Sequence, residues 1–424
     1  MKYALLLIIL VCTSATALPA QTPQPMPLPI TRTISVTAFG ARGDGKTNDT
    51  QAFIAAITVA ASEGARLQLG NATYLLTSTL TIPASARPIS IAGGTNTTLL
   101  FAPARHLDNA IVIAKNSAVE LKSFIIQGSG GGLSHAISVT GSTNVQLNAL
   151  QIKNIQGTGG LTTSAIVLGS DNLVWIINSA FTGVGAGPGK PALVIWNNYQ
   201  MDSQHIYISH NNMSGNTANI AIGMFDTYQS VVDSNVINGG NNCVSPCNNN
   251  GYGVLFYLEN LHGFPASSAP KLQDEIIVNN QITNTAGSGI YLVSVVGATI
   301  TGNLITHSSI RMDDTTLPAA GIALNGADNV SVTKNTIQND ARGGICLTTT
   351  KNDVIMGNEI DSSTEWGVHL RVANTNTTIE NNTIHTAPVG ILTHHDSVNS
   401  LIQNNVLIGV GQGLRSYSQG DTEN

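Results

Sequence analysis

The chain has few charged residues and few cysteines, and each shortage limits the classes of protein to which it can belong. Lysine, arginine, aspartate and glutamate make up only 10% of its 424 residues, and its formal net charge is −6 at pH 7. A nucleic-acid-binding protein needs a clustered basic face, so we expect no nucleic-acid partner. Asparagine, threonine, serine and glycine supply the polarity instead.

The apolar run Ala4–Val11 is too short to span a bilayer. It follows a lysine and precedes Ala15-Thr16-Ala17, the order of a secretory signal and its A-x-A cleavage site, with Ala20 as an alternative site. We therefore expect residues 1–20 to be a cleaved signal peptide, the mature chain to be secreted or periplasmic, and no membrane contact after cleavage. Residues 21–31 follow as a proline-rich, extended leader.

Removal of that signal would leave three cysteines. Cys243 and Cys247 lie in the asparagine-rich run NNCVSPCNNN, and in an exported protein we expect a local disulfide between them. A zinc site would need further ligands nearby, and that run offers none, so we expect neither a metal nor a cofactor. Cys346 is left over as a structural residue.

A repeat of about 23 residues fills the second half of the chain. Each unit has a small residue, an apolar-x-apolar strand and, some ten residues later, Asn-x-apolar; the leading glycines are Gly321, Gly344, Gly367, Gly390 and Gly413. A period in this range indicates a solenoid, whose units bury their apolar faces only by stacking. Brief strands with asparagine and glycine at the corners predict an all-β fold, a single-stranded right-handed parallel β-helix.

Less regular strands continue the pattern toward the amino terminus and predict about a dozen coils in one domain, residues 32–424. At about 4.8 Å per rung the solenoid would be about 60 Å long. The repeat is interrupted at residues 259–275 and 307–319, and insertions on one face of a solenoid often build a binding site.

One asparagine per coil forms a column, which we interpret as an internal ladder of stacked amides with no role in function. Its predicted members are Asn212, Asn235, Asn280, Asn303, Asn335, Asn358, Asn382 and Asn405.

The segment before the repeats predicts a helix over residues 49–62 that closes the amino-terminal end of the solenoid. Asn48 can cap this helix, with Gln51 completing a capping-box variant, and Gly64 follows as a stop signal. Asp44 and Asp49 fit a tight turn and a helix start better than a catalytic pair. The expected apolar face consists of Phe53, Ile54, Ile57 and Ala61.

Three short motifs around this helix, Phe39-Gly40-Ala41, Gly43-Asp44-Gly45 and Thr47-Asn48-Asp49-Thr50, resemble the opening of the pectate-lyase-like right-handed β-helix superfamily. The resemblance is to its rhamnogalacturonase- and epimerase-like pectate lyase domains. Tyr74 matches their first strand after the cap, whereas Asn71-Ala72 replaces their usual Pro-Gly. The resemblance implies the fold and does not choose a reaction, because the superfamily includes hydrolases, lyases, epimerases and phage tailspikes. The motifs of the polygalacturonase family do not occur here in order.

Alternation along each Ile-x-Leu strand places the residue x and the residue two further on at the outer surface. In coil order, the expected outward pairs are Val194 and Trp196, Ala221 and Gly223, Leu255 and Tyr257, Tyr291 and Val293, Ala323 and Asn325, Cys346 and Thr348, His369 and Arg371, Leu392 and His394, and Arg415 and Tyr417.

A first group of these outward residues is central. Trp196, Phe225, Tyr257 and Tyr291 would form an aromatic platform, and aromatic rings stack on the apolar faces of sugars. Asp226 and Glu259 end the same strand on successive coils, while Asp202 lies in the preceding loop. Two carboxyls about 5 to 10 Å apart serve glycoside hydrolysis as acid and as base or nucleophile.

This group predicts catalysis by Asp226 and Glu259, unless both are ordinary solvated turn residues. The predicted substrate contacts are Trp196, Tyr257, Tyr291, Asp202 and Tyr417.

A second group lies on the last coils and is cationic: His369, Arg371, His394, Arg415 and Tyr417. Arginine there would neutralise a uronate carboxylate, and histidine, arginine or tyrosine would move the proton in β-elimination or epimerisation. The alternatives are a solvated chain end and, for His394-His395-Asp396, a metal site.

Three functions therefore stay open, and a polysaccharide is the expected partner in each. Hydrolysis of glycosidic bonds by an exported enzyme is favoured. The second is a lyase or epimerase acting on a uronate polymer, and the third is a non-catalytic glycan-binding or surface solenoid. The sequence does not indicate the sugar, the linkage or the oligomeric state.

Overall fold

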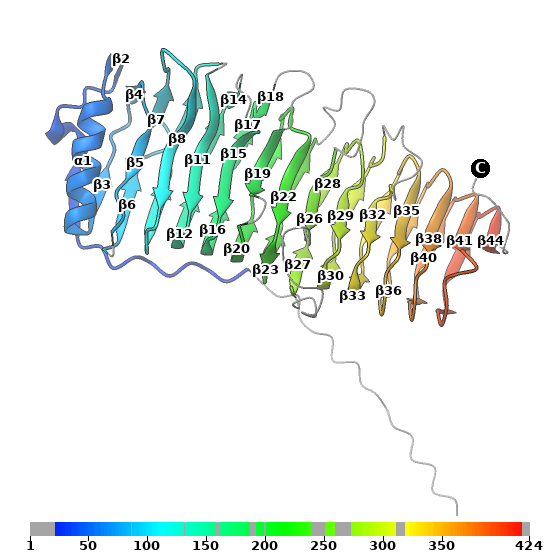
Figure 1. Cartoon of the computed structure of the whole chain (residues 1–424). Coiled ribbons are helices and arrows are strands. Elements are labelled where there is room, and N and C mark those ends of the chain that lie inside the picture. Colours follow the sequence, from blue (N-terminus) through cyan, green and yellow to red (C-terminus); the bar gives the residue numbers. More distant parts are fainter. Residues whose placement is uncertain are drawn as a thin grey trace, which may run out of the picture.

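The computed structural model describes residues 22–85, 87–130, 132–157, 162–186, 192–198, 201–239, 251–258, 273–310 and 319–417. Within these ranges the chain is a right-handed parallel β-helix of about a dozen coils with one α-helix across its amino-terminal end (Figure 1). The fold predicted from the repeats is thus confirmed. The signal peptide, Cys243, Cys247 and Glu259 lie outside the described residues, so their predicted roles stay predictions.

Three parallel sheets, here named A, B and C, run along the solenoid. In the described part of the chain they hold 15, 14 and 13 strands. Sheet A consists of β1 (Arg32–Ser35), β3 (Ala65–Gln68), β6 (Ile89–Ala92), β9 (Val119–Lys122), β12 (Thr143–Asn148), β16 (Asn172–Ile177), β20 (Ser203–Ser209), β23 (Thr227–Tyr228), β24 (Val231–Asp233), β27 (Glu275–Val278), β30 (Val296–Thr301), β33 (Asp328–Thr333), β36 (Val354–Met356), β39 (Thr378–Glu380) and β42 (Leu401–Gln403).

Sheet B follows sheet A in each coil. It consists of β2 (Asp44–Asn48), β4 (Thr73–Leu76), β7 (Thr98–Phe101), β10 (Ile125–Gly128), β13 (Gln151–Lys153), β17 (Ala180–Thr182), β21 (Asn212–Ser214), β25 (Val236–Asn238), β28 (Gln281–Thr283), β31 (Leu304–Thr306), β34 (Thr336–Gln338), β37 (Glu359–Asp361), β40 (Thr383–His385) and β43 (Val406–Ile408).

Sheet C completes the coil and contains the strands that the glycine repeat predicts. It consists of β5 (Leu80–Ile82), β8 (Leu107–Ala114), β11 (Leu133–Thr140), β15 (Thr163–Gly169), β19 (Ala192–Asn197), β22 (Ile220–Phe225), β26 (Val254–Tyr257), β29 (Ile290–Val293), β32 (Ile322–Asn325), β35 (Gly343–Thr348), β38 (Trp366–Val372), β41 (Val389–Thr393) and β44 (Gln412–Ser416). A separate small sheet pairs β14 (Gln156–Gly157) with β18 (Gly185–Ala186).

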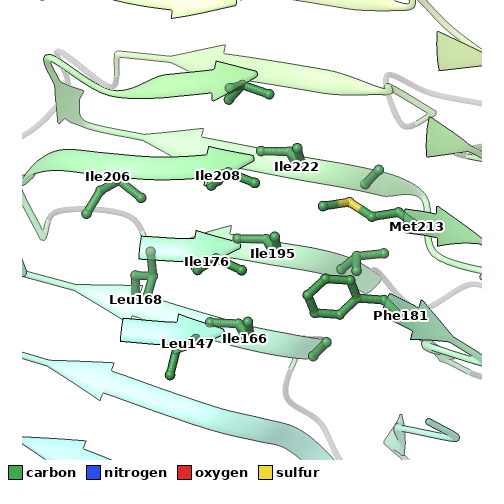
Figure 2. Packing of buried hydrophobic residues seen from close by; sticks show 14 of the residues in the cluster. Leu147, Ile166, Leu168, Ile176, Phe181, Ile195, Ile206, Ile208, Met213 and Ile222 are labelled. Carbon is green, nitrogen blue, oxygen red and sulfur yellow. The ribbon is translucent and has the colours of Figure 1, made fainter. Parts of the chain in front are cut away.

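The core fills the inside of the solenoid with stacked aliphatic side chains. Figure 2 shows Ile166, Ile195 and Ile222 one above another from three neighbouring strands of sheet C. All three are buried, as are the side chains of sheets A and B that face them. Each coil thus buries its apolar surface only against the coils beside it, as a solenoid requires.

The repeated glycine marks a bend at the start of the sheet C strand. A Cβ on Gly344 would lie 2.5 Å from Ile360 Cγ2 and 2.6 Å from the carbonyl oxygen of Gly367. A Cβ on Gly367 would meet Ile384 and Gly390 in the same way. The glycine period therefore records how closely this bend approaches sheet B and the next coil.

The asparagine ladder is present, with one correction to its first member. Asn235 and its successors are linked from coil to coil, as predicted, and all of them are buried except the last, Asn405, which is half-buried. Asn211, however, and not Asn212, occupies the first position, because it is Asn211 that donates to Asn235 Oδ1. Asn212 begins β21 and is exposed.

The amino-terminal helix α1 (Thr50–Glu63) lies across the open end of the first coils (Figure 1). Phe53, Ile57 and Ala61 are buried as predicted, whereas Ile54 is 38% exposed, so its expected place on the buried face was wrong. A 3-10 helix, η1 (Val36–Phe39), precedes it, and Gly64 ends it in a left-handed conformation.

Asp44 has the turn role expected of it, whereas Asp49 precedes the helix and its carboxylate makes no hydrogen bond to the first turn. The Asp49 carboxylate accepts hydrogen bonds from Arg42 N and Gly43 N. Asp44 accepts from Lys46 N and from Thr47 N and Oγ1, and the backbone hydrogen bonds from Thr47 and Lys46 lower its pKa to about 2.

Candidate functional site

The connections between strands single out one face of the solenoid. From β9 onward, every connection from sheet A to sheet B is two residues long. The long connections enter or leave sheet C: residues 239–253 and 258–274 lie on either side of β26, and residues 307–321 precede β32. Because insertions that border one face commonly form the binding surface of a solenoid, the outer face of sheet C is the place to look for a site.

The strand register on this face corrects the predicted outward columns. Trp196 pairs with Gly223, Gly223 with Leu255, and Leu255 with Tyr291. The expected alignment of Trp196 with Tyr257 was therefore wrong by two residues. Val194 and Ala221, predicted to point outward, are buried in the interior core, because they occupy the bend that glycine occupies in later coils.

The central aromatic residues form pairs and not one continuous platform. The ring centroids of Phe225 and Tyr257 are 5.9 Å apart on adjacent coils. The ring centroids of Tyr291 and Tyr252 are 5.0 Å apart, and those of Trp196 and His135 are 6.2 Å apart. Sequence reasoning missed Tyr252 and His135, because both precede the bend and fall outside the Ile-x-Leu pattern.

Exposure separates these rings into two kinds. Trp196 and Tyr257 are partly exposed and pack on a buried apolar cluster of the outer face. Phe225 and Tyr291 are themselves buried, at 3% and 7% exposure. The Tyr291 hydroxyl accepts a hydrogen bond of 3.3 Å from Asn325 Nδ2. Trp196 and Tyr257 thus offer ring surface to a ligand, while Tyr291 lies beneath it.

The structure stacks Asp202 and Asp226 on neighbouring coils. Ser203 pairs with Thr227 in parallel register, so the residue before each, Asp202 or Asp226, lies at the same corner from sheet C to sheet A. Ser203 N donates to the Asp226 carbonyl oxygen at 3.2 Å. Asp226 is buried at 6% exposure, whereas Asp202 is exposed. Neighbouring rungs of a sheet are about 4.8 Å apart.

A tyrosine and a third carboxyl complete this corner. Burial raises the pKa of Tyr228, and the charges of Asp202, Asp226 and Glu275 raise it further. Glu275 is fully buried and accepts hydrogen bonds from Thr227 Oγ1 at 3.0 Å and Ser230 N at 2.9 Å. Burial raises the pKa of Glu275 to about 8, so its ionised form is disfavoured near neutral pH. The backbone of Asp226 also joins it to Tyr257, whose carbonyl oxygen accepts from Asp226 N at 3.0 Å.

The second predicted group also assembles, on the last three coils. The rings of His369 and His394 are 5.4 Å apart, and His394 lies 4.8 Å from Tyr417. The Arg415 guanidinium carbon lies 4.9 Å from the centroid of the Tyr417 ring. Trp366, which sequence reasoning missed, contacts His369 at 5.0 Å.

His369 and His394 differ in what they can do. His369 is only 3% exposed, and burial, followed by the nearby His394 and Arg371, lowers its pKa to about 3. It is therefore a neutral ring that packs under the surface. His394, Arg371 and Tyr417 are partly exposed and Arg415 is exposed.

The described residues include neither a candidate metal site nor a candidate membrane-spanning helix. No three histidine, cysteine, aspartate or glutamate side chains gather there as a metal site would require. No helix in the same ranges is long and apolar enough to cross a membrane. Cys346 is buried and packs in the outer cluster of sheet C.

Comparison with known proteins supports the fold. The family model described as "Right handed beta helix region" matches residues 271–424. No curated protein matches the sequence. The family match covers the regular repeats and does not reach the motifs around α1, so the resemblance to pectate-lyase-like proteins stays a prediction.

Several solved structures have a similar backbone fold. Tailspike protein 3 of bacteriophage CBA120 matches with a TM-score of 0.68 at 16% identity, over 91% of this chain and 60% of the tailspike. The surface adhesin PfbA of Streptococcus pneumoniae matches with a TM-score of 0.60 at 14% identity, over 92% of this chain and 96% of the adhesin. The A-module of the mannuronan C-5 epimerase AlgE4 of Azotobacter vinelandii matches with a TM-score of 0.52 at 15% identity, over 91% of this chain and 100% of the A-module. At such identities the likeness is one of fold.

Proposed function

We propose that the chain is an exported, polysaccharide-active β-helix protein that hydrolyses glycosidic bonds at the corner formed by Asp202 and Asp226. The observation that carries the proposal is the pairing of Ser203 with Thr227, which places the residues before them, Asp202 and Asp226, next to each other on adjacent coils. Partly exposed Trp196 and Tyr257 lie on the strands that lead into this corner. Rings beside a pair of carboxyls suit a sugar chain that is held and cleaved in one place.

The different surroundings of the two carboxyls assign their roles. Asp226 is buried and is the proposed general acid that protonates the leaving oxygen. Asp202 is exposed and is the proposed nucleophile or base.

Glu259 keeps its predicted role in this proposal as a second candidate for the partner of Asp226. It follows Tyr257 by two residues and lies outside the described residues. Mutation distinguishes the two assignments, because only one of Asp202 and Glu259 is then required for the first bond cleavage.

The test is an incubation of residues 21–424 with a panel of neutral and acidic polysaccharides, with reducing ends and unsaturated product measured together. The variants Asp226→Asn, Asp202→Asn and Glu259→Gln are compared with Glu359→Gln, which changes an exposed carboxyl on sheet B. Hydrolysis at this corner gives reducing ends without unsaturation, which Asp226→Asn abolishes and Glu359→Gln leaves unchanged. Reducing ends that survive in Asp226→Asn would refute the assignment.

A second function has its own supporting observation, the contact of His394 with Tyr417 and of Tyr417 with Arg415. In a lyase or epimerase acting on a uronate polymer, Arg415 would neutralise the carboxylate while His394 and Tyr417 exchange the proton. The mannuronan epimerase among the similar structures is consistent with this reaction. Unsaturated or epimerised product that is lost in His394→Ala would move the active site to the last coils.

The third function is glycan binding without a reaction, for which the adhesin among the similar structures is a parallel. Binding to a polysaccharide of the panel with no new reducing end and no unsaturated product would favour it over both enzymes.

A further inference from the structure

The proline-rich leader lies along the outer face of sheet A as an extended strap. Residues 22–31 run from β24 back toward α1, against the direction in which the coils are added (Figure 1). Three side chains of the sheet hold it. Thr22 Oγ1 donates to Asp233 Oδ2 at 3.1 Å, Trp175 Nε1 donates to the Pro23 carbonyl oxygen at 2.8 Å, and Gln146 Nε2 donates to the Met26 carbonyl oxygen at 2.8 Å.

The contacts of the strap recur every third residue. Thr22 is buried and Pro25 and Leu28 are half-buried, while the two residues that follow Thr22 and the two that follow Pro25 are exposed. The two bonded carbonyls, on Pro23 and Met26, are also three residues apart. Three residues per turn is the period of the polyproline II helix, which proline at every second position favours here.

The surface under the strap is aromatic and apolar. Gln146, Trp175, Tyr207 and Val231 form one outward column on four successive strands of sheet A. The rings of Trp175 and Tyr207 stack with centroids 5.4 Å apart. Together with Ile177 and Val231 they form a buried cluster separate from the interior core. Aromatic grooves with a side-chain N–H directed at a peptide carbonyl are the usual receptors of polyproline II segments.

We propose that this column of sheet A is a polyproline-type peptide-binding site whose resident ligand is the chain's own residues 22–30. The indole N–H of Trp175 and the amide of Gln146 bind carbonyls three residues apart, and the half-buried Pro25 lies between these two carbonyls in the strap. The strap is therefore held by specific contacts with sheet A and not only by its covalent connection to the chain. A free peptide of the same sequence competes for the same surface of sheet A.

The experiment is carried out on the full chain with a fluorescein-labelled peptide, TPQPMPLPI. In the double variant Pro23→Gly/Pro25→Gly the resident strap loses its preorganised conformation, and the labelled peptide is expected to bind, measured as fluorescence anisotropy. Trp175→Phe in the same background keeps an aromatic ring without the indole N–H and is expected to weaken binding about 3- to 10-fold, the usual value of one hydrogen bond. Trp366→Phe, on sheet C, is the matched control and leaves binding unchanged.

Hydrogen exchange of the Trp175 indole N–H in the unmodified chain provides a measurement that needs no variant. Slow exchange is expected, and exchange at the rate of a free indole would overturn the proposal. A folded double variant that does not bind the peptide would also overturn it, because the strap would then be held by its covalent connection alone. The unmodified chain could prove to be a dimer and the double variant a monomer. That result would retain the binding site but show that the strap of a second copy occupies it.

Discussion

Asn211 donates its backbone N–H and its side-chain N–H to one acceptor, Oδ1 of Asn235 on the next coil, at 3.1 and 3.0 Å. The same side chain donates to the carbonyl oxygen of Ile176 at 2.8 Å, and its Oδ1 accepts from Ser179 N at 2.9 Å. One amide therefore satisfies backbone groups on both sides of a corner from which water is excluded. The arrangement recurs through Asn405 and fixes where each coil turns from sheet A to sheet B.

Replacement of Asn211 by alanine should therefore destabilise the fold far more than replacement of its neighbour. Asn211→Ala removes the acceptor of Ser179 N and one donor to the Ile176 carbonyl oxygen in a buried corner, which costs about 2 to 4 kcal/mol in the free energy of unfolding. Asn212→Ala changes an exposed side chain and should cost less than about 0.5 kcal/mol. Urea unfolding of both variants, followed by circular dichroism, measures the difference, and equal midpoints would contradict this account of the ladder.

The glycine column makes a second pair of variants informative. Gly344→Ala places a methyl group against Ile360 and the Gly367 carbonyl oxygen, and the backbone cannot withdraw without breaking the stack, so a loss of about 1 to 3 kcal/mol is expected. Gly413→Ala, in the last coil, meets only the tip of Leu407 at 3.2 Å and should be tolerated. The comparison is one of unfolding midpoints. If both alanines are tolerated alike, the column reflects something other than this close approach.

Buried acids should make the stability of the fold depend on pH. Burial raises the pKa of Glu275 to about 8 and those of Asp340 and Asp353 to about 7, while the unfolded chain has ordinary values near 4. Between these limits the folded state binds more protons than the unfolded state, so stability falls as pH rises. Burial of His369 acts in the opposite direction, but only below its ordinary pKa of 6.5.

The window from pH 6.5 to 8.5 thus isolates the acids, and the melting temperature should decrease across it. Glu275→Gln keeps the hydrogen-bond acceptor without the titration and should flatten the curve, whereas Glu359→Gln, on an exposed carboxyl, should leave its slope unchanged. Melting temperatures at constant ionic strength provide the test. A curve that rises over this range would show that these carboxyls are ionised in the folded protein.

The sequence was sufficient for the fold because every coil repeats the same physical requirement. Gly344 and Asn358 recur where the backbone must approach closely or turn, so their period alone indicates the architecture. Single residues were harder to place. Asn211 and Asn212 look alike in the sequence, and only the direction of the corner decides which of them is buried.

The candidate site depended on strand register, which the sequence specifies less firmly. The bend in each sheet C strand takes up one residue and so changes which of the following residues face outward. As a result, Trp196 does not align with Tyr257, and Val194 lies in the core. Asp202 and Asp226 are 24 residues apart, one coil, yet their alignment becomes evident only from the pairing of Ser203 with Thr227. The docking of the leader could not be predicted, because Trp175 and Gln146 lie more than a hundred residues beyond it.

Trp196 and Tyr257 are the rings that the structure leaves partly accessible on the outer face of sheet C. If the outer face of sheet C holds a glycan, Trp196→Ala and Tyr257→Ala should each weaken binding about 2- to 10-fold, because each removes a stacking surface that is partly exposed. Tyr291→Phe should have little effect, because that ring is buried and loses only the hydroxyl that accepts from Asn325. Affinity electrophoresis with the polysaccharides of the panel compares the three variants on one gel. Should Tyr291→Phe weaken binding as much as Trp196→Ala, the glycan must reach the column beneath, and the face would have to open in the bound state.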